Sequence, residues 1–128
     1  MTAGLAIVNA RVWTGDPRRP WADAVLVHGE TLAAVGSSAE IRKRARPDTV
    51  TIDAQGMTVV PAGLSGGDGE AVPGAAPGTL RAGLPASLVM LDRPLTRVDA
   101  DTVRDAGVML AISAGRVVAD PGGLTRRS

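Results

Sequence analysis

The chain has no cysteine, no phenylalanine and no tyrosine among its 128 residues, and it contains one histidine and two tryptophans. The lack of cysteine excludes disulfides, thiolate metal sites and a cysteine nucleophile. A catalytic zinc site usually takes three protein ligands, so a single histidine cannot form one without other good ligands. With so few rings, the core must consist of valine, leucine, isoleucine and alanine, which bury less area per residue.

Long apolar runs are missing as well. No stretch approaches the roughly 18 apolar residues of a membrane-spanning helix, and the first residues lack the basic start and apolar segment of a secretory signal. We therefore expect a soluble, cytoplasmic protein that does not bind membranes. The net charge is only +1, and the one basic cluster is Arg42-Lys43-Arg44 with Arg46. Without aromatic residues to stack bases, this cluster does not indicate nucleic acid as a partner.

Short apolar segments alternate with glycine turns, which predicts an all-β fold, a small sandwich or barrel with one short helix. At 128 residues the chain forms one domain and is too short for a (β/α)8 barrel, which needs roughly 200 residues. Ser37 or Ser38 is expected to cap a helix that continues to Ala45, and Asp101 a single turn that continues to Asp105. The expected strands are 5–9, 10–14, 23–28, 31–35, 49–53, 57–60, 87–92, 108–113 and 116–119.

One break divides the chain. Residues 62–78 contain six glycines and two prolines and almost no bulky apolar side chain, which is typical of a linker. We therefore expect a single domain over residues 1–128. It would have an N-terminal part (1–61), the linker (62–78), a C-terminal part (79–120) that shares the same core, and a tail (121–128).

Several segments carry a resemblance through their order and spacing. They are 8–15, 24–27 with Gly29, 32–36, 52–56, 59–61, 78–80, Gly83, 85–92 and 115–118. Together they resemble the small β-sandwich, or composite, domain of the amidohydrolase superfamily of metal-dependent hydrolases. The resemblance implies a sandwich made from both ends of the chain, with a catalytic barrel inserted between them. In this chain the glycine-rich linker stands in place of that barrel.

The same resemblance implies a metal site that this chain does not match. In the family, two histidines follow the first barrel strand, and further histidines, a lysine and an aspartate complete the site. Here Gly67 and Gly69 stand at the first two ligand positions, and the single histidine, His28, lies outside the matching segments. We therefore assign no catalytic, metal-binding or cofactor-binding residue, and we expect no cofactor.

Four other features resemble parts of functional sites. Gly63-Leu64-Ser65-Gly66-Gly67 matches the nucleophile elbow G-x-S-x-G, but glycines follow where a helix is needed, and His28 precedes Ser65. His28 itself is expected to be an exposed turn residue. Asp99, Asp101 and Asp105 lack the central glycine and terminal glutamate of a calcium loop. The basic cluster is expected to be the solvated face of the short helix.

Two hypotheses of different classes follow. In the first, the chain is a non-catalytic domain that acts through self-association, as a homodimer, or through a protein partner, because a sandwich without its barrel would expose apolar surface. In the second, it is a hydrolase of amide-type C–N bonds, either with residual activity at Ser65 or as a subunit that completes an amidohydrolase.

Overall fold

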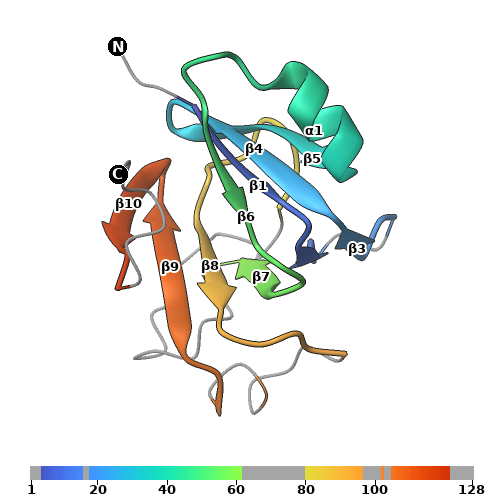
Figure 1. Cartoon of the computed structure of the whole chain (residues 1–128), viewed down its shortest axis with the longest axis vertical. Coiled ribbons are helices and arrows are strands. Elements are labelled where there is room, and N and C mark those ends of the chain that lie inside the picture. Colours follow the sequence, from blue (N-terminus) through green and yellow to red (C-terminus); the bar gives the residue numbers. More distant parts are fainter. Residues whose placement is uncertain (1–3, 16–17, 62–79, 97–101, 103–104, 122–128) are drawn as a thin grey trace.

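A computed structural model describes residues 4–15, 18–61, 80–96, 102 and 105–121. These residues form two β-sheets with a short helix on the outer side of the smaller sheet (Figure 1). The predicted all-β class with one short helix is therefore confirmed. In chain order the elements are β1 (Leu5–Val8), β2 (Arg11–Trp13), β3 (Trp21–Ala22), β4 (Ala24–His28), β5 (Thr31–Gly36), α1 (Ser38–Arg44), β6 (Val50–Asp53), β7 (Thr58–Pro61), β8 (Leu88–Leu91), β9 (Val108–Ser113) and β10 (Arg116–Ala119).

The strand order is β5-β4-β1-β6 in the four-stranded sheet and β10-β9-β8-β7-β2-β3 in the six-stranded sheet. Most neighbours are antiparallel, including the predicted hairpins β4–β5 and β9–β10. Two pairs, β1–β6 and β2–β7, are parallel. In the six-stranded sheet β7 pairs with β8, so the parts of the chain before and after residues 62–79 share one sheet.

The chain passes from the small sheet to the large one at Asn9, between β1 and β2. Asn9 has a φ of 55°, in the left-handed region that asparagine tolerates better than most residues. The crossing from β6 to β7 runs beside it, because the N–H of Ala54 donates to Val8 O and that of Gly56 to Asn9 O. The paired crossings explain why β1–β6 and β2–β7 are both parallel.

The main core lies between the sheets and draws on both parts of the chain. Ile7, Val12 and Val25 pack in the same cluster as Leu88 and Ile112, and all five are 2% exposed or less. The prediction that strands before residue 61 and after residue 86 share a core is confirmed. No Phe or Tyr is present, so the cluster consists of aliphatic side chains, as the composition required.

Helix α1 covers the opposite face of the small sheet. Its only buried residue, Ile41, packs on small side chains that let the helix approach closely, among them Ala6, Ala24 and Ala34. The N-cap is Ser37, whose Oγ accepts from the N–H of Glu40, while Glu40 Oε1 accepts from the N–H of Ser37. This capping box fixes where the helix begins. Within the described ranges, no helix is long and apolar enough to cross a bilayer.

Some local expectations were wrong. Strand β2 ends at Trp13, and Thr14 instead donates its hydroxyl to the carbonyl of Arg19, closing the loop to a strand, β3, that was not predicted. Trp21 of β3 packs edge-to-face on Trp13, with ring centroids 5.1 Å apart.

The short turn expected near residue 101 is helical at Thr102 and Asp105. Its expected cap, Asp101, lies outside the described residues.

The tips of the two hairpins meet. The N–H of Gly115, in the β9–β10 turn, donates to Ala86 O at 2.9 Å, and the N–H of Ala86 donates to Glu30 O in the β4–β5 turn at 2.9 Å. A short bridge pairs Thr31 with Pro85. The segment around Ala86 therefore joins the ends of the two sheets.

Candidate functional site

The structure places His28, the single histidine, exposed at the end of β4, as expected. Among the described residues there is no group of three His, Cys, Asp or Glu side chains that could hold a metal. Ser65, Gly67 and Gly69 lie outside the described residues, as do Asp99 and Asp101. With one histidine and no cysteine, the donor set of this chain does not fit the metal site implied by the resemblance.

The carboxylates with shifted pKa values serve local structure. The pKa of Asp53 is lowered chiefly by the N–H of Gln55, which donates to Oδ1 at 2.9 Å. The pKa of Asp92 is lowered chiefly by the side chain of Arg93, whose Nε lies 2.8 Å from Oδ1. Both groups are exposed and held ionised, so neither is suited to take up a proton near neutral pH.

The basic cluster lies where the sequence predicted. Arg42, Lys43 and Arg44 are exposed in the last turn of α1, and Arg46 is exposed just beyond it. Positive charge at a helix C-terminus interacts favourably with the helix dipole. The cluster is thus the solvated end of the helix.

The sheet edges differ in how they are protected. Strand β5 is covered at its start, because the N–H of Leu32 donates to Leu84 O at 2.9 Å and its carbonyl accepts from Gly83 N at 2.8 Å. Near its end, Arg19 Nη1 donates to Val35 O at 3.2 Å. These bonds occupy backbone groups that would otherwise be open to another strand.

Two further edges offer little to an apolar partner. Strand β6 presents the exposed polar residues Thr51 and Asp53. Strand β3 has only two residues, Trp21–Ala22. Short and polar edge strands are common ways to prevent sheets from joining.

The fourth edge, β10, is different. All four of its residues are exposed, with Val117 at 37% and Val118 at 59%. In the described part of the chain, the exposed large hydrophobic residues are these two and Val108, at 41%, on the neighbouring β9. Strand β10 pairs with β9 on one side only, and a β-bulge lies between Val117 and Ala119.

The far face of the large sheet carries less exposed apolar surface than expected for a sandwich without its barrel. Val60, Val89, Leu91 and Leu95 form a buried cluster there, each 9% exposed or less. Trp13 packs partly against it. Among the described residues, the large hydrophobic side chains that remain exposed are therefore on the β9–β10 hairpin. The sequence revealed β10 as a strand but not as an edge, since no local signal distinguishes the two.

No protein-family model matches the chain. Over 57 residues, 44% of the chain, it is 49% identical to an N-substituted formamide deformylase of Arthrobacter pascens. Among solved structures, it is similar to an enamidase of the amidohydrolase superfamily over 47% of its length, with 30% identity and a TM-score of 0.39. An uncharacterized metal-dependent hydrolase from Pyrococcus furiosus matches the same share, with 18% identity and a TM-score of 0.39.

Over slightly less than half of its length, the chain is therefore similar in sequence to the deformylase, in agreement with the predicted resemblance to metal-dependent hydrolases. The chain spans 10% of the deformylase, 16% of the enamidase and 13% of the Pyrococcus protein. It therefore corresponds to a small part of each.

Proposed function

We propose that this chain is a non-catalytic, hydrolase-related domain that acts by self-association, forming a two-fold dimer through β10. The observation that carries the proposal is the unpaired side of β10, a strand with Val117 and Val118 exposed. A strand with free backbone groups and apolar side chains is a ready template for another strand.

Two contributions would favour the dimer: backbone hydrogen bonds between the paired strands and burial of valine side chains. An added strand would pair the N–H and C=O groups on the side of β10 that faces away from β9, and it would cover the two valines. Fully burying a valine stabilises by roughly 1.5 kcal/mol or more, and a two-fold contact counts each residue twice. Burial of the four part-exposed valines contributes at most about 6 kcal/mol before the cost of association, so the dimer depends on the backbone hydrogen bonds of the paired strands as well.

A second copy fits this edge through its charge pattern. Strand β10 begins at Arg116 and is followed by Asp120, so its two ends carry opposite charges. In an antiparallel pair of β10 strands, Arg116 of each copy faces the end that carries Asp120 of the other. Opposite charges across such a pair are favourable. The bulge between Val117 and Ala119 increases the local twist, which suits a closed pair better than an open-ended stack.

The experiment is light scattering over a dilution series with a charge variant. Val118→Lys should shift the particle from twice the 13.0 kDa chain mass to the chain mass, because a lysine on the edge disfavours strand pairing. The matched control is Ala39→Lys, on the exposed side of α1, which should leave the dimer intact. A particle that stays at 13.0 kDa at high micromolar concentration contradicts the proposal.

A hydrolase of amide-type C–N bonds is the second candidate, and the 49% identity to the deformylase is what favours it. In that case the chain would use Ser65 or complete a site carried by another chain. Assays with N-substituted formamides, with Ser65→Ala as the control, distinguish the two. Turnover that is lost in S65A would support the hydrolase and exclude the non-catalytic proposal.

A further inference from the structure

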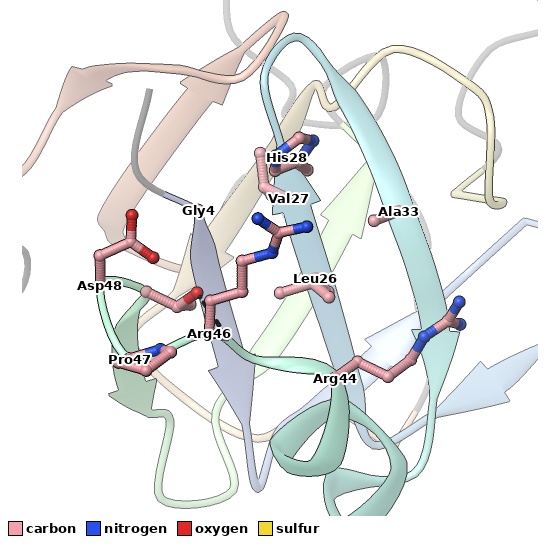
Figure 2. A pocket seen from close by; sticks show the side chains of 10 residues that line it. Gly4, Leu26, Val27, His28, Ala33, Arg44, Arg46, Pro47 and Asp48 are labelled. Carbon is pink, nitrogen blue, oxygen red and sulfur yellow. Dashed lines mark hydrogen bonds between the residues drawn. The ribbon is translucent and has the colours of Figure 1, made fainter. Parts of the chain in front are cut away.

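A surface basin of about 540 Å³ lies on the α1 side of the small sheet (Figure 2). Its position follows from the length of α1. The seven-residue helix packs on Ala6, Ala24 and Ala34 and ends before it has covered the whole face. Beyond the helix, the floor is made by Leu26 of β4 and Ala33 of β5. The basin shares no residue with the β9–β10 hairpin.

Two arginines and the single histidine, from separate elements, line this basin. Arg44 comes from the end of α1, Arg46 from the turn that follows it, and His28 from the end of β4. Figure 2 shows the guanidinium of Arg46 reaching over β4 towards His28, while the carboxylate of Asp48 stands on the opposite rim. Within the described part of the chain, neither Arg44 nor Arg46 forms an ion pair. Arg44 does lie within electrostatic reach of Glu40, whose carboxylate is held by the capping box.

The turn that carries Arg46 is held in place. The N–H of Arg46 donates to Thr49 Oγ1 at 3.0 Å, and the N–H of Thr49 donates back to Arg46 O at 2.9 Å. These two bonds fix the backbone from which the guanidinium extends. A group fixed in this way loses less conformational freedom when it binds a ligand.

We propose that this basin binds a small organic carboxylate with an apolar body. The guanidinium of Arg46 would hold the carboxylate, because its planar array of N–H donors matches the two oxygens. Arg44, which Figure 2 shows directed towards β5, would add positive charge at the rim. The apolar body would lie on Leu26 and Ala33. Since both arginines are exposed to water, which weakens each contact, the affinity falls in the millimolar range.

The test is an NMR titration of the full chain with benzoate, observed at the backbone amides of Gly4, His28 and Thr49. The expected result is saturable shifts at roughly millimolar benzoate. Benzyl alcohol, which lacks the charge, should give no saturable shift, and inorganic phosphate, which lacks the apolar body, should bind more weakly. Absence of saturable shifts with benzoate overturns the proposal, as does equal binding of benzyl alcohol.

Matched variants separate this site from general electrostatic attraction. Arg46→Gln should weaken benzoate binding by about tenfold through loss of a charge-assisted contact. Arg42→Gln removes the same charge from α1 at a position that does not line the basin, and it should change affinity less than about twofold. Arg46→Lys, which keeps the charge, should bind benzoate with intermediate affinity. It keeps the test informative if R46Q does not fold. An equal loss in R42Q and R46Q would overturn the proposal.

Discussion

Gly115 packs directly against the carbonyl of Gly29, where the turn of the β9–β10 hairpin meets the turn of β4–β5. A Cβ atom added to Gly115 would overlap the carbonyl oxygen of Gly29, and Gly115 also has a φ of +81°. Both the close approach and the backbone conformation therefore require glycine. The contact joins the part of the chain before residue 62 to the part after residue 79.

Replacing Gly115 should destabilise the protein more than backbone strain alone would. Gly56 provides the control, because it has a φ of +86° and no atom within 4 Å of an added Cβ. Gly56→Ala should cost about 1–2 kcal/mol from the left-handed conformation. Gly115→Ala should cost a further 1–3 kcal/mol, roughly, from the overlap. Urea denaturation measures both, and equal losses in the two variants would contradict the close packing of the turns.

The shared core predicts a large effect at Leu88. This residue is fully buried in β8, among side chains from the N-terminal part. Leu88→Ala should cost about 2–5 kcal/mol, from lost burial and the cavity left behind. Thr51→Ala, at an exposed position on β6, should stay within about 0.5 kcal/mol of the parent. Comparable losses in both variants would mean that Leu88 is not central to the core.

The N-terminal part should not fold by itself. In residues 1–61 alone, β7 would lose β8 as its partner, and the core would lose Leu88, Leu110 and Ile112. The remaining strands would expose apolar faces, so we expect an unfolded or aggregating fragment. Circular dichroism during heating measures whether the fragment has a cooperative unfolding transition. A cooperative transition of the fragment would show that the second part is not needed.

The capping box predicts a pH-dependent contribution from Glu40. Hydrogen bonds from the backbone and then the side chain of Ser37 lower the pKa of Glu40 below its ordinary value of 4.5. The folded state therefore favours the ionised form. The resulting stabilisation is present above pH 4.5, where the unfolded chain is also ionised, and is lost as the pH falls through the lowered pKa. Glu40→Gln should be less stable than the parent at neutral pH, and the difference should shrink in acid.

Glu30→Gln is the control for this prediction, because Glu30 is an exposed carboxylate in the β4–β5 turn. It removes the same charge without touching the helix cap. Stability curves from pH 7 to roughly pH 3 should show the acid-dependent difference for E40Q only. The same pH profile in both variants would assign the effect to net charge.

The donor set predicts that the purified chain holds no stoichiometric transition metal. The chain has one histidine and no cysteine, too few good ligands for a zinc site of the usual kind. Elemental analysis after dialysis measures this. Near-equimolar zinc that disappears in His28→Asn would overturn the prediction and the non-catalytic proposal with it.

Local patterns in the sequence determined most of the elements. The turn at Gly29 between two apolar runs predicted the β4–β5 hairpin, and the pair Ser37-Ser38 predicted the start of α1, because turns and caps depend on neighbouring residues. The aliphatic core followed from composition. The short strand Trp21–Ala22 was not predicted, because two residues are too few to show the alternation of apolar and polar side chains.

Only the tertiary structure decided how these elements combine. It assigned Leu5–Val8 and Arg11–Trp13 to different sheets, and it left β10 at an open edge while β5 was covered. It also placed His28 and Arg46, eighteen positions apart in the sequence, around one basin. Pairing, edges and cavities depend on which distant segments meet, and alternation within a strand carries no information about its neighbours.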